Sequence, residues 1–270
     1  MENRSIIWNR HKENIYHIMN SVEKTIQILN CLSDADRSLG ITEISLKLSI
    51  PKSTVHRILS ILLNYSLVSR ERDTSRYRLG VQILKYSNSF YNSFDLRRYS
   101  KRVLKRTCLD TGLTTFLCIW QDGRGICIDS ARSFQNPQMH HLFVDIGKIM
   151  PFHCAAAAKI LLAYQSSEEI DRLIKNTSFQ RYTFKTIVDP ERLREHLNEI
   201  KSKGFAVCDE ELEEGIRAIS APIRNFNGKT IASITITGLV NRITSVVFDQ
   251  LVKTVVNAAN EISQMIGYNK

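Results

Sequence analysis

The sequence predicts an α+β protein built from two domains, and three observations support this prediction. Apolar residues recur at helical spacing near the N-terminus and are followed by two short strand-like runs. In the second half, strand-like runs are joined by short turns and alternate with helical segments, which is typical of helices packed on an antiparallel sheet. The chain has 270 residues, 43% of them hydrophobic and 24% charged, and this composition excludes a disordered, collagen-like or coiled-coil protein.

Changes in composition divide the chain into four predicted segments. They are a polar N-terminal lead (1–19), a first domain (20–80), a linker helix (81–95) and a second domain (96–270). Residues 86–93 are rich in serine and asparagine, which favour caps and turns over helix interiors, so a helix break is expected there. The domain boundary is therefore placed near Asp95.

The first domain begins with two short helices. Asn20 and Glu23 have the spacing of a capping box, so the first helix is expected over residues 20–33. The second is expected to begin near Thr42, because threonine is a favourable N-cap residue. Residues 34–40 form the loop between them.

A third helix and a strand hairpin complete the first domain. Proline is favoured in the first turn of a helix, so Pro51 predicts a helix over residues 51–64. Its apolar stripe follows the i, i+3, i+4, i+7 pattern and consists of Val55, Ile58, Leu59 and Leu62. Two strands are expected over residues 67–71 and 76–79, with the polar residues 72–75 at the hairpin tip.

The second domain starts with a basic helix at residues 96–106 and continues with paired strands. Asp122-Gly123 is the two-residue signal for a tight hairpin. The further elements expected are strands 114–121, 124–131, 216–223 and 230–238 and helices 151–164, 167–175, 189–203 and 246–266. Because the strands pair through hairpins, an antiparallel sheet with helices on it is predicted.

Positive charge gathers on the first domain in a pattern that favours DNA. The whole chain has a net charge of +10, and residues 38–80 contain seven basic and three acidic side chains. The major groove accepts one α-helix, whose side chains contact base edges, whereas wing arginines contact phosphates. The candidate DNA-binding residues are Thr42, Lys52, Ser53, Thr54, His56 and Arg57 on the helices and Arg72 and Arg76 on the wing. A small helical domain with a solvated basic face is the alternative.

An alanine-rich helix start is the candidate ligand site of the second domain. Residues 155–158 are four successive alanines that follow Pro151, Phe152, His153 and Cys154. The free backbone N–H groups at a helix N-terminus favour a carboxylate, and small side chains leave them accessible. Tight packing of a helix on a sheet also requires alanine and remains the alternative.

These segments resemble the IclR family of transcriptional regulators. The run Ile50-Pro51-Lys52-Ser53-Thr54-Val55-His56-Arg57, followed by Tyr77-Arg78-Leu79-Gly80, is similar to the winged helix–turn–helix domain of that family. Residues 147–163, 204–222 and 234–238 are similar to its effector-binding domain. The resemblance covers residues 20–266. It implies a GAF-like α/β effector domain that binds a small metabolite, often a carboxylic acid, and a homodimer that can pair into tetramers.

Position by position, the resemblance also implies which residues contact the effector. Backbone amides come from Ala156 and Ala157, and the side chains are those of Cys208, Ala218, Thr235 and Thr237. Several relatives have a polar or acidic group at the position of Cys208 and a cysteine at that of Ala218. Ala158 replaces a glycine common in the family. The less polar pocket predicts a carboxylate with a hydrophobic or aromatic portion rather than a two-carbon oxo-acid.

Other signals in the sequence are weaker. Cys118 and Cys127 would face each other across the predicted hairpin, which permits either a disulfide or two buried thiols in a reducing cytosol. The acidic run at residues 209–214 is expected to be a solvated face rather than a metal site, and His140-His141 lack ligand spacing. His153 is expected to be structural. No cofactor is expected.

The function predicted from the sequence is therefore sequence-specific DNA binding modulated by a small carboxylate. The predicted partners are double-stranded operator DNA, the effector and a second copy of the chain. Neither a signal peptide nor a membrane span is predicted, so a cytoplasmic location is expected. A redox-responsive regulator that uses Cys118 and Cys127 is one alternative. An enzyme acting on a small acid is another, although no nucleophile–base constellation appears.

Overall fold

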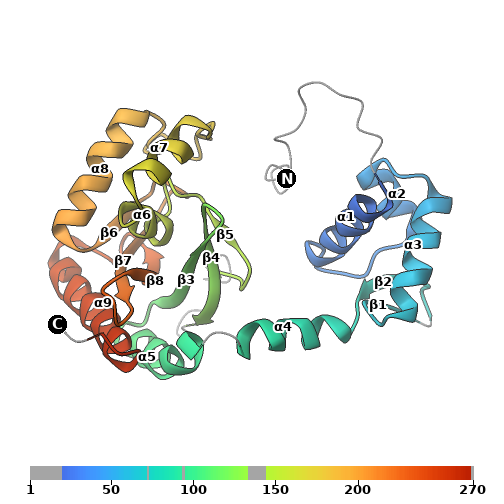
Figure 1. The fold of residues 1–270 in the computed structure, drawn as a ribbon, viewed down its shortest axis with the longest axis horizontal. Coiled ribbons are helices and arrows are strands. Elements are labelled where there is room, and N and C mark those ends of the chain that lie inside the picture. Colours follow the sequence, from blue (N-terminus) through green and yellow to red (C-terminus); the bar gives the residue numbers. More distant parts are fainter. Residues whose placement is uncertain (1–19, 72, 93–94, 133–143, 269–270) are drawn as a thin grey trace. The chain divides into compact units, whose positions relative to one another are not determined.

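The computed structural model describes residues 20–71, 73–92, 95–132 and 144–268. The chain divides into two compact units, residues 1–93 and 94–270, and each has its own apolar interior (Figure 1). Among the described residues, no helix is both long and apolar enough to cross a lipid bilayer. The two units are described separately below.

The N-terminal unit contains four helices and a two-stranded hairpin in its described part. The elements are α1 (Ser21–Ser33), α2 (Ile41–Leu48), α3 (Lys52–Asn64), β1 (Val68–Arg70), β2 (Tyr77–Leu79) and α4 (Gln82–Asn92). The predicted capping box is confirmed, since Asn20 Oδ1 accepts from Glu23 N and Glu23 Oε2 accepts from Asn20 N, both at 2.9 Å. The apolar stripe of α3 is buried, as its spacing predicts.

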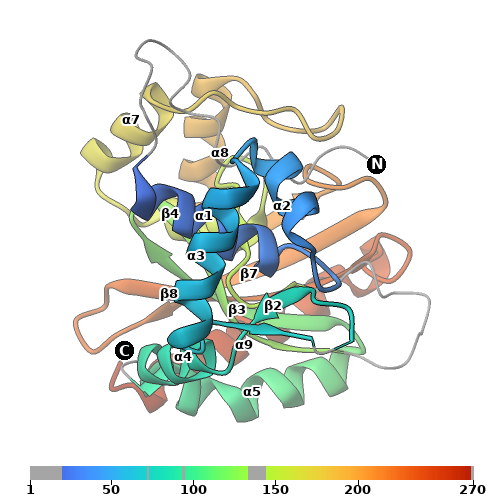
Figure 2. The ribbon, with the colours of Figure 1, turned by 90° about the vertical axis from the view of Figure 1, so that its right-hand side faces the viewer.

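A left-handed turn joins α2 to α3 and produces a helix–turn–helix (Figure 2). Ser49 has φ 56°, and Ser45 Oγ donates to the carbonyl of Ile50 at 2.7 Å, which closes the turn. One local prediction is wrong: the N-cap of α2 is Gly40, and Thr42 lies in its first turn. Glu43 caps the free N–H of Gly40, so a threonine cap is not needed.

Within the stretch 86–93, where a helix break is expected, α4 continues to Asn92 and ends there, and the next helix begins at Asp95. Serine and asparagine cost a helix only about 0.5 kcal/mol each relative to alanine. No proline or glycine interrupts this segment. The composition therefore lowers the helix propensity without ending the helix before Asn92.

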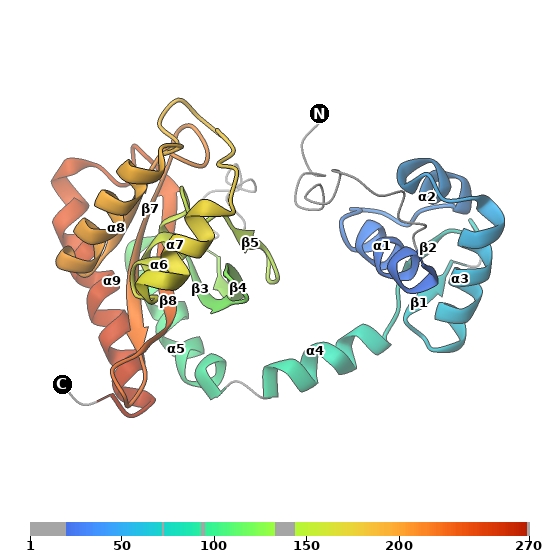
Figure 3. The same ribbon diagram turned by 45° about the horizontal axis from the view of Figure 1, so that its top comes forward.

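The C-terminal unit is a six-stranded antiparallel sheet with helices on both faces. The strand order is β5-β4-β3-β8-β7-β6. The strands are β3 (Thr114–Gln121), β4 (Arg124–Ala131), β5 (Ile149–Met150), β6 (Ala206–Asp209), β7 (Ile216–Arg224) and β8 (Thr230–Leu239). The helices are α5 (Asp95–Thr111), α6 (Ala156–Ala163), α7 (Ser167–Lys175), α8 (Pro190–Lys203) and α9 (Ser245–Met265). Helix α6 covers one face, and α5 and α9 cover the other (Figures 1 and 3).

The hairpin between β3 and β4 has the predicted register. Asp122 and Gly123 both have positive φ, at 51° and 76°, which a tight two-residue turn requires. Cys118 lies opposite Cys127, and a register shift follows at Leu117. Both cysteines are free thiols with no exposed surface.

Sequence signals at the helix ends of this unit were accurate except at α5, which continues to Thr111 rather than Arg106, and at α6. Helix α8 begins after Asp189, whose carboxylate accepts from Arg192 N at 2.8 Å, and ends at Gly204 with φ 77°. Helix α6, in contrast, begins at Ala156 and not at Pro151. A single turn, in which the Pro151 carbonyl accepts from Ala155 N at 2.9 Å, precedes it.

Candidate functional sites

The outer face of α3 presents most of the predicted DNA-binding side chains. Lys52, Ser53, His56 and Arg57 are exposed and Thr54 is half-buried, while the opposite face of the helix is buried. Thr42 is exposed in the first turn of α2. Their polar groups are therefore available to a partner without any rearrangement of the apolar interior.

The two predicted wing residues differ in what can be said of them. Arg72 lies outside the described residues. Arg76 is directed toward the helices: its Nη1 donates to Glu43 Oε2 and to the carbonyl of Ser38, both at 3.0 Å. Arg70 and Arg78 on β1 and β2 are exposed, and neither forms an ion pair with any carboxylate that the structure describes.

All six predicted effector residues line one cavity of about 70 Å³ in the C-terminal unit. They are Ala156 and Ala157 on α6, Cys208 on β6, Ala218 on β7, and Thr235 and Thr237 on β8. Its apolar wall is formed by Phe116, Val144, Met150, Leu212 and Ile216. The exposed side chains of Lys148 and Glu213 also belong to the lining.

Two backbone donors are available in this cavity. The N–H groups of Ala156 and Ala157 have no acceptor among the residues that the structure describes. They belong to the first turn of α6, where the helix dipole favours negative charge. Donors without partners, next to apolar side chains, suit the carboxylate of a partly apolar molecule.

The side-chain hydroxyls and the thiol of the cavity are neutral. Thr235 Oγ1 donates to Ser220 Oγ at 2.8 Å, and Thr237 Oγ1 donates to the carbonyl of Arg217 at 3.3 Å. Burial raises the pKa of the Cys208 thiol, which therefore remains protonated at neutral pH. These buried side chains add no negative charge, and the only carboxylate in the described lining, that of the exposed Glu213, is accompanied by the exposed cation Lys148.

The next alanine of the run has a packing role. A Cβ added at Gly125 on β4 would lie 2.8 Å from the Cβ of Ala158, so helix and strand are in closest contact there. The two explanations of the alanine run therefore apply to different residues. Ala158 packs on the sheet, whereas Ala156 and Ala157 line the cavity.

The lysine that follows the alanine run forms a buried ion pair that was not foreseen from the sequence. Lys159 on α6 is fully buried, and its Nζ donates to Glu211 Oε1 at 2.5 Å and to Oε2 at 2.7 Å. The third donor of Lys159 bonds to His196 Nε2 at 3.1 Å. The expectation that the acidic run is a solvated face is thus wrong for Glu211, since the lysine holds this carboxylate in the interior.

The surroundings set the protonation of these groups. Burial, together with the charge of Lys159, lowers the pKa of His196 to about 4, so its imidazole is neutral and accepts the hydrogen bond. Burial raises the pKa of Glu211, and the neighbouring ammonium group offsets part of this effect. All three N–H donors of Lys159 have partners, as a buried cation requires.

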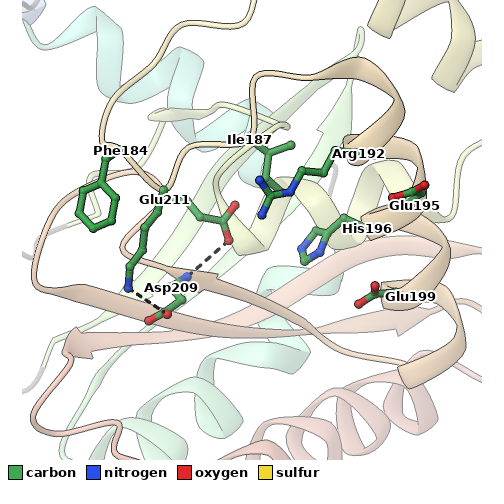
Figure 4. A pocket seen from close by; sticks show the side chains of 9 residues that line it. Phe184, Ile187, Arg192, Glu195, His196, Glu199, Asp209 and Glu211 are labelled. Carbon is green, nitrogen blue, oxygen red and sulfur yellow. Dashed lines mark hydrogen bonds and ion pairs between the residues drawn. The ribbon is translucent and has the colours of Figure 1, made fainter.

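A second, larger cavity of about 490 Å³ lies between α8 and β6 (Figure 4). Figure 4 shows Arg192, His196 and Glu211 among the side chains that line it. Three of its carboxylates already have cationic partners: Asp209 pairs with Lys185 at 3.2 Å, Glu199 with Lys203 at 3.1 Å, and Glu211 with Lys159. None of the predicted effector residues lines it.

The remaining sequence signals have simple structural explanations or lie outside the description. His153 Nε2 donates to the carbonyl of Gln180 at 2.9 Å, and its ring stacks on Phe179. His140 and His141 are outside the described residues. Within the described ranges, no group of three or more His, Cys, Asp or Glu side chains could hold a metal ion.

Comparisons with known proteins relate both units to one family. Residues 21–72 match the family described as IclR helix-turn-helix domain, and residues 89–264 match bacterial transcriptional regulator IclR C-terminal. The HTH-type transcriptional regulator XynR of Escherichia coli (strain K12) is 27% identical over 251 residues, which are 93% of this chain and 98% of XynR.

Solved structures give the same relationship. A crystal structure of an IclR transcriptional regulator from Alicyclobacillus acidocaldarius has a TM-score of 0.78 at 27% identity and covers 92% of this chain and 98% of its own. An IclR homolog from Microbacterium hydrocarbonoxydans, solved in complex with 4-hydroxybenzoate, has a TM-score of 0.79 at 18% identity, with 92% and 99% covered. The second likeness concerns the fold alone.

Proposed function

This chain belongs to the IclR family of bacterial transcriptional regulators, and on that basis we propose that a small carboxylate controls its affinity for specific operator DNA. It acts in the cytoplasm as a homodimer and is a regulator rather than an enzyme. The observation that carries the effector part of the proposal is the pair of unpartnered N–H groups at Ala156 and Ala157, which face an apolar-walled cavity.

For the DNA part, α3 enters the major groove and its exposed side chains contact the bases. Arg57 and His56 are exposed one after the other on α3, and Lys52 and Ser53 are exposed in its first turn. In a dimer, two such helices contact half-sites about 34–36 Å apart. Thr42, Thr54, Arg72 and Arg76 support the same interface.

For the effector part, the ligand's carboxylate accepts hydrogen bonds from Ala156 N and Ala157 N. Its apolar portion packs on Phe116, Met150 and Leu212, and Cys208, Ala218, Thr235 and Thr237 complete the contacts. The cavity of about 70 Å³ is under half of the ~150 Å³ that holds benzene in an engineered protein cavity. An aromatic portion therefore requires displacement of the wall, whereas a short branched aliphatic portion fits more easily.

The ligand changes operator affinity because it prefers one of two arrangements of the homodimer. A ligand shifts an equilibrium only as far as its affinities for the two states differ. Helix α4 connects the two units along the chain and is the segment through which the coupling passes.

A redox response through Cys118 and Cys127 is the second candidate, favoured by their direct opposition across the hairpin. Their complete burial argues against it, and burial also raises the pKa of Cys118, which disfavours the reactive thiolate. If Cys118→Ser and Cys127→Ser leave the operator response to peroxide unchanged, the redox candidate is eliminated.

The test combines operator selection with calorimetry. Selection from random duplexes at physiological ionic strength, with and without acids, should enrich one sequence, and an unenriched pool would refute the proposal. Titration should then compare glyoxylate, isobutyrate, benzoate and 4-hydroxybenzoate. We expect acids with an apolar portion to bind, and tight binding of glyoxylate alone would contradict the expected ligand class.

A variant of the cavity provides the matched control. Ala157→Leu places a large side chain at the free N–H groups and should abolish acid binding. Ala163→Ser, at the far end of α6, should preserve it. Equal binding by both variants would mean that the acid does not occupy this cavity.

A further inference from the structure

A carboxylate on α2 collects hydrogen bonds from both sides of the N-terminal unit. Glu43 Oε2 accepts from Arg76 Nη1 at 3.0 Å and from the backbone of Gly40 at 2.9 Å. Its other oxygen accepts from Arg37 Nη2 at 2.6 Å. Arg76 directly precedes β2, whereas Arg37 lies in the loop before α2, so the carboxylate of Glu43 joins the wing to the helices.

Several further bonds hold the wing to the same loop. Leu39 and Tyr77 exchange backbone hydrogen bonds of 2.9 and 2.8 Å. Ser38 Oγ donates to Glu71 Oε2 at 3.1 Å, and the Ser38 carbonyl accepts from Arg76. The loop before α2 therefore pairs with β2 through one antiparallel bridge between Leu39 and Tyr77.

The other described wing arginines are in a different situation. Arg78 Nε donates to Ser69 Oγ at 3.3 Å, and Arg70 Nη2 donates to Ser75 Oγ at 2.7 Å. Arg70 also lies over the ring of Tyr77, 5.8 Å from its centroid, and Arg78 interacts electrostatically with Glu71. Neither guanidinium forms an ion pair among the described residues, so both remain available to a phosphate. The guanidinium of Arg76, in contrast, already donates hydrogen bonds to the carboxylate of Glu43 and the carbonyl of Ser38.

We infer that Arg76 is a positioning residue that acts through Glu43 to fix the wing against α2 and α3, and that phosphate contacts are made by Arg70 and Arg78. This inference rests on the proposed binding of DNA and revises the phosphate contact expected of Arg76. The Glu43–Arg76 clamp (Glu43, Arg76 and the Ser38 carbonyl) holds the wing against α2 and the loop before it, so that both are ordered before DNA arrives. Binding then does not have to order them.

The direction in which one substitution changes the affinity for DNA distinguishes this inference from a direct contact between Arg76 and phosphate. Glu43→Gln removes a negative charge near the interface but keeps an acceptor for the N–H of Gly40. If Arg76 contacted phosphate, the loss of its competing carboxylate would tighten binding to every duplex. If the clamp positions the wing, Glu43→Gln weakens binding.

The experiment is a double-variant cycle on the full chain with a random-sequence 30-bp duplex as the probe, followed by fluorescence anisotropy over a salt series. We expect Glu43→Gln and Arg76→Gln each to weaken binding by about three- to tenfold, the range for one lost hydrogen-bond interaction. The double variant should lose less affinity than the two single losses combined, because both changes break the Glu43–Arg76 interaction, whereas the ion pair of Glu43 with Arg37 is affected by Glu43→Gln alone. The inference would be overturned if Glu43→Gln bound the duplex more tightly than wild type. It would also be overturned if the two substitutions changed DNA affinity in opposite directions and their effects added in the double variant.

Arg78→Gln is the matched control within the hairpin. It should reduce the magnitude of the salt slope by about 0.9, the value for one phosphate contact. Amide hydrogen exchange provides a readout without DNA: Arg76→Gln should accelerate exchange at Leu39 and Tyr77 by about three- to tenfold, while Arg78→Gln leaves it unchanged. If wild-type protein binds no duplex, the proposed function fails. The exchange rates still decide the clamp, since unchanged exchange in Arg76→Gln overturns it.

Discussion

Glu43 in the N-terminal unit and Glu211 in the C-terminal unit both accept hydrogen bonds from cationic side chains, and the two carboxylates behave in opposite ways. Glu43, near the surface, has its pKa lowered to about 2 by its hydrogen bonds with Arg37 and Gly40. Glu211 accepts two bonds from Lys159, yet burial raises its pKa. The same pairing chemistry therefore stabilises the charged form in one unit and only partly offsets its desolvation in the other.

This difference matches the work proposed for each unit. The N-terminal unit keeps its charges hydrated, so the exposed side chains of α3 and the wing remain able to contact a polyanion. The C-terminal unit pairs the charges of Lys159 and Glu211 with each other inside the fold. Lys159 is therefore not free to contact the proposed anion, for which the backbone N–H groups of Ala156 and Ala157 are available.

Breaking the buried pair tests the comparison with the largest expected effect. Lys159→Met leaves the carboxylate of Glu211 buried without a cation, and such a loss costs about 3–5 kcal/mol of unfolding free energy. Chemical denaturation monitored by circular dichroism measures it. Glu43→Gln, the matched change at the surface, should alter the unfolding free energy far less.

The double variant Lys159→Met with Glu211→Leu completes this test. Replacing a whole buried ion pair by apolar residues of similar size is often neutral or stabilising. We therefore expect the double variant to have an unfolding free energy equal to or higher than that of wild type. A double variant as unstable as the single one would show that desolvation is not what distinguishes the two carboxylates.

Removing an exposed cation should affect binding rather than folding. Arg57→Ala should weaken binding to the selected operator by about 1–3 kcal/mol, with little change in unfolding free energy. Arg242→Ala, an exposed arginine of the C-terminal unit, is the control and should leave DNA binding unchanged. The same loss on random duplexes would contradict base recognition by Arg57.

Acid should expose a smaller difference between the units. The pKa of His196 is lowered from 6.5 to about 4, so below pH 6.5 the unfolded chain binds a proton that the folded chain does not. The stability of the C-terminal unit should therefore fall between pH 6.5 and 4, by about 1–2 kcal/mol because the imidazole is only half-buried. For Glu43 the sign is the same, but its contribution is lost between pH 4.5 and about 2.

The variant His196→Gln isolates the contribution of the imidazole. Glutamine keeps an acceptor for Lys159 but does not titrate, so the dependence of unfolding free energy on pH between 6.5 and 4 should become weaker. Comparison with wild type also cancels the opposite effect of Glu211, whose raised pKa favours the folded chain in acid. An unchanged pH profile would assign the acid sensitivity to another group.

Local patterns were sufficient to predict most of the fold. The stripe from Val55 to Leu62 indicates helix α3 and its buried face, and Asp122-Gly123 determines the register that places Cys118 opposite Cys127. These features depend on neighbours within a few residues. The cavity residues required the family resemblance, because Ala156 and Thr235 lie far apart in the sequence and carry no distinctive chemistry.

The two charged clusters could not be predicted from the sequence for the same reason. Lys159 pairs with Glu211 across 52 positions and with His196 across 37, and nothing near either partner indicates the other. Arg76 and Glu43 are 33 positions apart. A lysine after four alanines resembles a solvent-facing residue, and only the tertiary fold reveals that it is buried.

The absence of a side chain at position 125 determines how closely helix α6, with its unpartnered N–H groups, approaches the sheet. Helix α6 lies so near β4 that one additional methyl group at Gly125 would meet Ala158 at 2.8 Å. Accommodating that methyl group would push the helix outward and carry the donors of Ala156 and Ala157 with it. The position of these two donors in the cavity thus depends on residue 125, which lies outside the cavity lining and would not touch the proposed ligand.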